Sequence, residues 1–215
     1  MPDIAARLRA VLPGGVVLAE ASGPDDLWPG EDLPGAIPAR LAEFAHGRSA
    51  ARQAMIGLGF EPAAIPMRQD RAPIWPSAVT GSISHCEGAC MAALARRGDY
   101  RGLGLDLEPR RALPPELWST ILRPEELYQI NDLPLPQQGL QALRFFVAKE
   151  AAYKAQYAVT QQIFDFQTLR ILFQNQSFVA EFCATVPPFE KHFQFVGRCV
   201  ESQLYCAAFC WLPIA

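Results

Sequence analysis

A strict alternation of leucine with small or acidic residues over residues 102–108 is the clearest pattern in the chain. Successive side chains of a β-strand point to opposite faces, so this period of two predicts a strand. The core face of that strand holds Leu103, Leu105 and Leu107. The opposite face holds Gly102, Gly104, Asp106 and Glu108. Gly104 leaves room for a close approach to the backbone, and Pro109 ends the strand.

Two carboxylates therefore lie on the same face of this strand. Like charges at that spacing repel and raise each other's pKa unless a cation lies between them. Asp106 and Glu108 form either a solvated strand end or a site for a hard metal ion that prefers oxygen ligands.

A helical pattern covers residues 141–157, where apolar residues recur at spacings of three and four. The stripe consists of Leu143, Phe146, Val147, Glu150, Lys154 and Tyr157. Glu150 thus falls inside the apolar stripe, and a buried carboxylate needs a partner. That partner is Lys154 one turn on, a metal ion, or both. The alternative is an ordinary surface pair worth about 0.2–0.5 kcal/mol.

A second helix is predicted over residues 39–58, introduced by Pro38 and ended by Gly57 and Gly59. Its apolar stripe places Arg48 on the core side, with Arg52 one turn further along. Arginines in such positions either bind an anion or extend to solvent along a packed helix.

The other patterns predict short elements. Residues 1–38 read as one strand near residues 16–18 followed by irregular loop. Residues 81–85 and the continuous apolar run 89–95 read as strands that form an antiparallel meander with 102–108, which brings Ser84 and His85 near its end. Short helices follow in 110–140, and Pro134 and Pro136 break the chain before the long helix. Four further strands are expected at 164–173, 177–184, 193–200 and 204–211.

Composition narrows the class of function. The chain has 215 residues, half of them hydrophobic, and a net charge of −3, so it has no global basic field for nucleic acid or an anionic membrane. Its six cysteines lack Cys-x-x-Cys spacing, and most of them lie in apolar runs and read as buried free thiols. The presence of only three histidines argues against zinc. No run approaches the ~20 apolar residues of a membrane span. A reducing compartment, the cytoplasm, is expected.

Three motifs occur in order along the chain: Gly-Ser-Ile-Ser-His at 81–85, Gly-Leu-Asp-Leu-Glu at 104–108, and Phe-Val-Ala-Lys-Glu-Ala-Ala-Tyr-Lys at 146–154. Together they resemble the signature motifs of the 4′-phosphopantetheinyl transferases of the surfactin and enterobactin type. The Gly47-Arg48 helix and residues 68–76 are similar to the enterobactin-associated branch. The resemblance covers about residues 40–160. At position 146 the chain has phenylalanine where the family often has tryptophan, and the enterobactin-associated branch often has phenylalanine there too.

The resemblance implies an α+β fold of two similar halves related by a pseudo-twofold. Each half is a helix packed on a small antiparallel sheet, and the active site lies in the cleft between them. We expect an N-terminal half over residues 1–109 and a C-terminal half over 110–215, with the protein a monomer.

It also implies the activity of a holo-[carrier protein] synthase. The enzyme would transfer the 4′-phosphopantetheine arm of coenzyme A to a serine of an apo acyl, peptidyl or aryl carrier protein, with Mg²⁺, and release adenosine 3′,5′-bisphosphate. The pathway would be that of a siderophore or another secondary metabolite. The implied metal ligands are Asp106, Glu108 and Glu150. The implied catalytic residues are Glu150, directly or through a water it holds, and Lys154. The residues implied to bind coenzyme A are Arg48, Arg52, Arg68, Arg71, Ser84, His85, Lys149 and Lys154.

Two other functions fit parts of the pattern. An Asp-x-Glu pair with a distant glutamate would also serve a metal-dependent phosphodiesterase. A catalytically silent module that binds coenzyme A or carrier proteins is the alternative outside enzymes, although no metal carboxylate has been lost.

Overall fold

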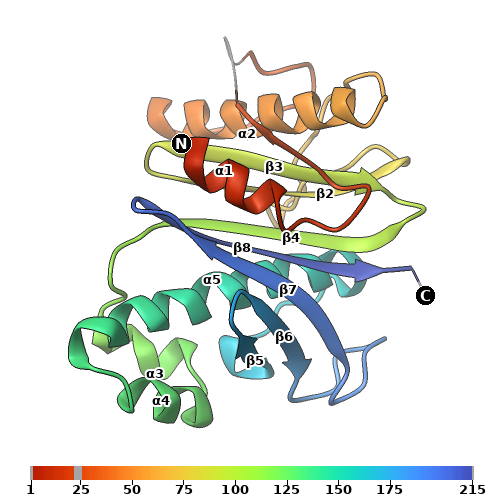
Figure 1. The fold of residues 1–215 in the computed structure, drawn as a ribbon. Coiled ribbons are helices and arrows are strands. Elements are labelled where there is room, and N and C mark those ends of the chain that lie inside the picture. Colours follow the sequence, from red (N-terminus) through yellow and green to blue (C-terminus); the bar gives the residue numbers. More distant parts are fainter. Residues whose placement is uncertain (1, 22–25, 215) are drawn as a thin grey trace.

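Two antiparallel sheets lie against each other in the computed structural model, which describes residues 2–21 and 26–214 (Figure 1). The three-stranded sheet has the order β1 (Val17–Glu20), β3 (Ala89–Arg96), β2 (Val79–Cys86). The five-stranded sheet has the order β4 (Tyr100–Pro109), β8 (Tyr205–Pro213), β7 (Gln194–Glu201), β6 (Ser177–Phe182), β5 (Leu169–Gln174).

Each sheet carries one long helix on its outer face. The helix α2 (Pro38–Gly57) covers the three-stranded sheet, and α5 (Leu135–Thr160) packs on β4 and β8 of the five-stranded sheet (Figure 1). The remaining helical elements are α1 (Pro2–Arg9), η1 (Pro115–Leu117), α3 (Trp118–Ile121), α4 (Pro124–Asn131) and η2 (Phe166–Thr168). The predicted α+β architecture, with one helix on each small antiparallel sheet, is confirmed.

Three apolar clusters hold these layers together. The central cluster lies between the sheets and includes Leu103, Leu105 and Leu107, all fully buried, as the alternation predicts. The second joins α2 to the outer face of the three-stranded sheet, and the third joins α5 to the outer face of the five-stranded sheet. Strand β3 contributes Ala93 to the central cluster and Leu94 to the α2 cluster, so the run without alternation is covered on both faces as predicted.

The predicted meander is wrong in one connection. Strands β2 and β3 form the expected hairpin, but β4 leaves their sheet and pairs with β8. The leucine face of β4 has to be covered by a second sheet, and its glycine face has to be covered by a helix. As a member of the larger sheet, β4 has the three-stranded sheet on its leucine face and α5 on its glycine face. The division of the chain at residue 109 stays a prediction, although the pairing puts β4 with the C-terminal strands.

Other boundaries differ from the sequence prediction. Residues 2–9 form a helix where loop was expected, and of the predicted loop, residues 22–25 lie outside the described residues. Pro134 and Pro136 do not break the chain before the long helix, because Pro134 is its N-cap and Pro136 lies in its first turn, where a missing N–H costs nothing. The long helix therefore starts at Leu135. The predicted strand at 164–173 starts at Leu169, after the short helix η2.

The close packing of α5 on β4 depends on two glycines. A Cβ added to Gly104 would lie 1.8 Å from the Ala151 carbonyl oxygen, and one added to Gly102 would lie 2.1 Å from the Ala155 carbonyl oxygen. The room that the sequence predicted at Gly104 is thus taken by the backbone of α5, which brings the side chains of this helix to the strand.

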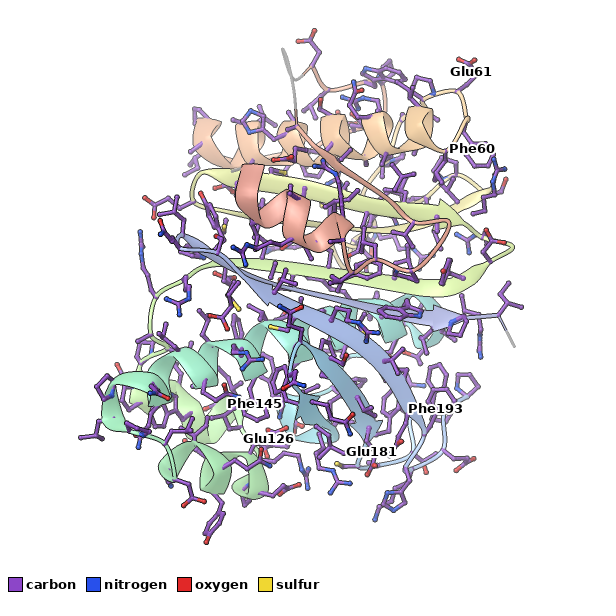
Figure 2. All side chains as sticks on the ribbon, in the orientation of Figure 1. Phe60, Glu61, Glu126, Phe145, Glu181 and Phe193 are labelled. Carbon is purple, nitrogen blue, oxygen red and sulfur yellow. The ribbon has the colours of Figure 1, made fainter. Side chains whose placement is uncertain are left out.

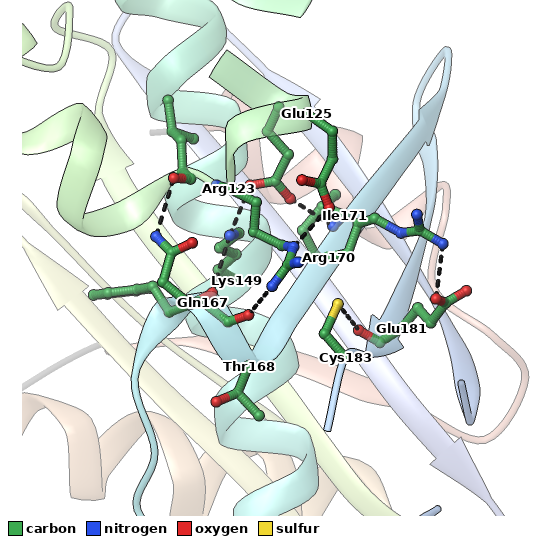
Figure 3. A network of polar contacts seen from close by, with 12 residues as sticks. Arg123, Glu125, Lys149, Gln167, Thr168, Arg170, Ile171, Glu181 and Cys183 are labelled. Atoms are coloured by element: carbon green, nitrogen blue, oxygen red, sulfur yellow. Dashed lines mark hydrogen bonds and ion pairs between the residues drawn. The ribbon is translucent and has the colours of Figure 1, made fainter. Parts of the chain in front are cut away.

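A buried ion pair fixes α4 to α5. Lys149 and Glu126 are both almost fully buried, and the Lys149 ammonium lies 2.7 Å from Glu126 Oε2. The ammonium also donates to the Ile121 and Phe166 carbonyls at 2.8 and 3.0 Å, while Glu126 accepts the Ile171 N–H of β5 at 2.8 Å. Figure 3 shows Lys149 within the wider polar network, and Figure 2 shows Glu126 near Phe145 in the C-terminal half. The pair thus joins two helices to the edge strand.

No helix among the described residues is long and apolar enough to cross a membrane. All six cysteines are free thiols, and Cys199, Cys206 and Cys210 are buried, as the sequence predicts for this residue type.

Substituting Gly104 by alanine should destabilise the protein by about 1–3 kcal/mol or prevent folding, because the new methyl group overlaps the backbone of α5. Urea unfolding followed by circular dichroism measures the change. Gly98→Ala is the matched control, since a Cβ there meets nothing within 4 Å. Equal stability of both variants with wild type would contradict the close approach.

Substituting Lys149 by methionine should lower the free energy of unfolding by about 3–5 kcal/mol, because it leaves Glu126 buried without its cation. Burial already raises the pKa of Glu126, and loss of the ammonium raises it further. A carboxyl with a raised folded pKa loses stability as the pH rises, so the deficit should be larger at about pH 8 than at about pH 5.

Lys191→Met is the control for this prediction. Its side chain is exposed, so its effect should stay within about 0.5 kcal/mol. A Lys149→Met deficit that does not depend on pH would show that Glu126 is not the group left uncompensated.

Candidate active site

Asp106 lies on β4 where β2 and α5 both reach that strand, and only 4 % of its surface is exposed. Its Oδ1 lies 2.6 Å from the Lys154 ammonium and accepts a hydrogen bond from the Ser84 hydroxyl at 3.2 Å. Its Oδ2 is buried and has no hydrogen-bond partner among the residues that the structure describes. A buried acceptor without a partner is costly. This oxygen is therefore ready to accept a cation.

Lys154 reaches Asp106 from α5, over the glycine face of β4. Besides the ion pair, its ammonium donates to the Leu105 carbonyl at 3.1 Å and lies 3.5 Å from Ser84 Oγ. Its side chain keeps 29 % of its surface exposed. Lys154 thus orients Asp106 and is still reachable by a ligand from solvent.

The other two predicted metal ligands, Glu108 and Glu150, are half-buried and interact electrostatically with Asp106. Burial and then the Asp106 charge raise the pKa of Glu108 to about 7. Burial and then Asp106 also raise the pKa of Glu150. Within residues 2–21 and 26–214, no group of three or more His, Cys, Asp or Glu side chains is arranged tightly enough to hold a metal ion. The three carboxylates share one environment without forming a closed ligand set.

The chemistry of these donors, although not their present arrangement, suits a divalent cation. The unpartnered Asp106 Oδ2 needs a positive charge or a donor, and the mutual repulsion of the carboxylates would be relieved by a cation. Oxygen donors alone suit Mg²⁺ better than softer metals.

The apolar stripe in the sequence included Glu150, but Glu150 is not the most buried charged residue of α5. That residue is Lys149, whose ammonium is held by Glu126 and two carbonyls as described above. Its predicted contact with coenzyme A stays a prediction. Glu150 instead lies at the edge of the buried face. It borders a cavity of about 130 Å³ whose lining includes Tyr153, Phe164 and Phe166.

His85, at the end of β2, contacts an arginine that the sequence interpretation missed. The Nη1 atom of Arg40 lies 2.6 Å from His85 Nε2 and 2.8 Å from a Glu43 carboxylate oxygen. Burial and then the Arg40 charge lower the pKa of His85. The signal for Arg40 was its spacing, since it precedes Arg48 by eight residues on the same helix.

Arg48 lies on the core side of α2 as predicted, with 6 % of its surface exposed. Its guanidinium lies 3.6 Å from the centre of the Phe44 ring, and its Nε donates to the Ile65 carbonyl at 3.2 Å. Burial lowers the pKa of Arg48 to about 10. Its Nη2 is buried and lacks a hydrogen-bond partner within the described part of the chain. This donor remains available for an anion.

Arg52 is buried for a different reason. Its Nη1 lies 2.8 and 2.7 Å from the two carboxylate oxygens of Glu31, and its Nη2 donates to the Asp26 carbonyl at 2.9 Å. Glu31 also accepts the Ile65 N–H, so the pair ties an N-terminal loop to α2. Glu31 lies in a proline-rich stretch, where no pattern in the sequence points to it. A contact of Arg52 with coenzyme A stays a prediction.

Arg68 and Arg71 lie at an exposed loop tip whose sides meet at Met67 and Pro73. Arg68 donates to the Gln161 side chain at 2.9 Å, and Asp70 accepts a hydrogen bond from Tyr157 at 2.6 Å. The loop from the N-terminal half therefore touches the end of α5. The structure thus gathers Ser84, Asp106 and Lys154 with Glu108 and Glu150, and brings Arg40 and His85 next to them.

Comparison with known proteins agrees with this arrangement. A family model described as the 4′-phosphopantetheinyl transferase N-terminal domain matches residues 29–95. A second, described as the 4′-phosphopantetheinyl transferase superfamily, matches residues 102–210, which is half of the chain. The two matches flank the β3–β4 turn.

Two of the similar proteins carry the family's name, and a third is named as a component of enterobactin synthase. The chain is 36 % identical over 174 residues to 4′-phosphopantetheinyl transferase Npt of Nocardia iowensis, which covers 78 % of this chain and 77 % of the relative. It is 36 % identical to 4′-phosphopantetheinyl transferase Svp of Streptomyces mobaraensis, over 74 % of this chain and 68 % of the relative. It is 35 % identical to enterobactin synthase component D of Escherichia coli (strain K12), over 54 % of each chain. Both matched domains and the similarity over most of the chain identify this protein as an enzyme of the 4′-phosphopantetheinyl transferase superfamily.

Proposed function

We propose that this transferase moves the 4′-phosphopantetheine arm of coenzyme A to a serine of an apo carrier protein in a Mg²⁺-dependent reaction. The observation that carries the proposal is the environment of Asp106. One carboxylate oxygen is fixed by Lys154 and Ser84, while the other is buried beside two more carboxylates, with no hydrogen-bond partner among the described residues.

Asp106, Glu108 and Glu150 would hold the metal ion. When bound, Mg²⁺ supplies positive charge that stabilises the transferring phosphoryl group and its leaving oxygen. Lys154 keeps Asp106 in place and presents its own charge to the same region. The remaining side chains have to bind the other anionic groups of coenzyme A.

Arg40, Arg48 and His85 form the cationic side of the site. Arg48 has a buried donor without a partner, and Arg40 is within 2.6 Å of His85. Phosphate accepts charge-assisted hydrogen bonds from such groups. Arg68 and Arg71 add positive charge from the loop that meets the end of α5. A negative net charge on the whole chain is compatible with this site because the cations are local.

In the transfer step, the carrier serine oxygen forms a bond to the phosphorus that bears the pantetheine arm. The bond from that phosphorus to the adenosine-side oxygen breaks, and adenosine 3′,5′-bisphosphate leaves. Glu150, or a water it holds, accepts the serine proton. Glu150 borders the cavity lined by Tyr153, Phe164 and Phe166, and we place the approach of the serine and of the uncharged arm there.

The carrier protein is proposed to belong to a siderophore or another secondary-metabolite pathway, since relatives at 35–36 % identity include enterobactin synthase components. The free cysteines suit a reducing compartment, and we place the enzyme in the cytoplasm as a monomer.

Incubation with coenzyme A, Mg²⁺ and an apo carrier protein should add one phosphopantetheine to the carrier, measured by intact mass. Chelation of the metal or Glu150→Ala should abolish the addition. Asp106→Asn should lower the rate at least about a hundredfold, because bound metal contributes several kcal/mol to the transition state.

Asp99→Asn is the matched control for the aspartate substitution, because Asp99 is exposed in the turn before β4. Its rate should equal that of wild type. Hydrolysis of coenzyme A without a carrier would indicate a phosphodiesterase. Tight coenzyme A binding without transfer to several carriers would indicate a silent binding module.

Arg40→Ala should raise the KM for coenzyme A about three- to tenfold with little change in kcat, because it removes a phosphate-binding charge that is partly exposed to solvent. Arg9→Ala, which removes another helical surface arginine paired with Glu20, should leave the KM unchanged. A loss of kcat at unchanged KM would assign Arg40 to a different step.

A further inference from the structure

Strands β2 and β4 are edge strands of different sheets that lie side by side, and serine hydroxyls connect them. The Leu105 N–H donates to Ser82 Oγ at 2.9 Å, and the Leu107 N–H donates to Ser84 Oγ at 3.1 Å. Two serines that are two residues apart on β2 thus accept hydrogen bonds from two N–H groups that are two residues apart on β4. Both serines are buried, with 5 % and 4 % of their surfaces exposed.

The two hydroxyls differ in what else they contact. Ser84 Oγ also lies 3.2 Å from Asp106 Oδ1 and 3.5 Å from the Lys154 ammonium. A hydroxyl has one hydrogen to donate and two lone pairs to accept with. At Ser84, the two lone pairs accept from the Leu107 N–H and from Lys154. The hydroxyl hydrogen is donated to Asp106, because an ionised carboxylate can only accept. With these three contacts, the hydrogen and both lone pairs of the Ser84 hydroxyl are already used.

We propose that Ser84 is a positioning residue that fixes the Asp106 carboxylate, rather than the phosphate ligand that its motif suggests. The inference rests on the proposed Mg²⁺-dependent transfer. Ser84 and Lys154 both hold Oδ1, which fixes the rotation of the carboxylate and leaves Oδ2 as the oxygen presented to the cation. Groups that orient a metal ligand in this way affect metal affinity without touching the metal.

Ser82 provides a matched control inside the same structure. It makes the same kind of bond to β4 but has no carboxylate partner among its contacts. Ser82→Ala and Ser84→Ala each remove one hydroxyl from the junction between the sheets, so both should lower the melting temperature by a similar amount. Only Ser84→Ala should change what happens at Asp106.

The experiment measures metal binding without turnover. Mn²⁺ is titrated into each enzyme, alone and with coenzyme A, and free Mn²⁺ is followed by electron paramagnetic resonance. Ser84→Ala should weaken Mn²⁺ binding about tenfold, whereas Ser82→Ala should change it less than about twofold. Ser84→Cys, which keeps the size of the side chain with a weaker donor, should fall between wild type and Ser84→Ala. It also replaces Ser84→Ala if that variant does not fold.

Steady-state kinetics separate the positioning role from phosphate binding. At saturating Mg²⁺, the KM for coenzyme A should stay within about twofold of wild type in both alanine variants, because neither hydroxyl binds the substrate. A large rise of this KM in Ser84→Ala with unchanged Mn²⁺ affinity would overturn the proposal in favour of a phosphate contact. Equal loss of Mn²⁺ affinity in Ser82→Ala and Ser84→Ala would also overturn it. Since the Mn²⁺ titration contains no carrier protein, it tests Ser84 independently of whether transfer occurs.

Discussion

The contact between α5 and β4 is the constraint on which the site depends. Gly102 and Gly104 have no side chains, so the backbone of α5 can lie against the strand at a distance that any Cβ would prevent. This approach brings Lys154 within 2.6 Å of Asp106 and places Glu150 of the same helix in the same electrostatic environment. A longer separation between helix and strand would leave Asp106 buried without its cation, which is a costly arrangement. The close contact between α5 and β4 therefore both packs the C-terminal half and brings Glu150 and Lys154 to Asp106.

The second face of β4 explains why the candidate site lies where the two sheets meet. The three leucines opposite the glycines are covered by the other sheet, and this cover brings β2 alongside β4. Ser82 and Ser84 then satisfy N–H groups that would otherwise be exposed at a sheet edge. The same junction carries Ser84 to Asp106 and His85 to the neighbourhood of Lys154. One alternating sequence thus directs both the core and the site.

Local pattern predicted much of this arrangement because its signals are short-range. The alternation at 102–108 gave the faces of β4, and the stripe on α2 gave the burial of Arg48. What failed depended on contacts distant in sequence. The pairing of β4 with β8 spans about half of the chain, and no period within residues 81–108 distinguishes it from continued pairing with β3. Prolines 134 and 136 read as breakers because the sequence does not reveal whether a proline stands in the first turn of a helix or ahead of it. The sequence also did not identify the partners of Lys149 and Arg52. Glu126 lies in the short helix α4 and Glu31 in a loop, and nothing in the local pattern pairs either of them with a cation more than 20 residues away.

Those partners distinguish cations that are paired inside the fold from a cation that keeps an unpaired donor, although all of them look alike in the sequence. Lys149 and Arg52 each meet a buried carboxylate whose oxygens also accept backbone N–H groups, so every charge in these pairs is matched inside the fold. Arg48 and Asp106 differ, because each retains one buried polar atom without a hydrogen-bond partner in the described chain, a property they share with Arg144 and Arg170. A folded protein tolerates few such atoms, since each costs free energy that nothing within the chain returns. Arg48 on α2 thus offers one donor, and Asp106 on β4 offers one acceptor. Electrostatic contacts through Arg40, His85 and Lys154 link the two. This is the pattern expected of a site that is completed by an anion and a cation that the chain itself does not supply.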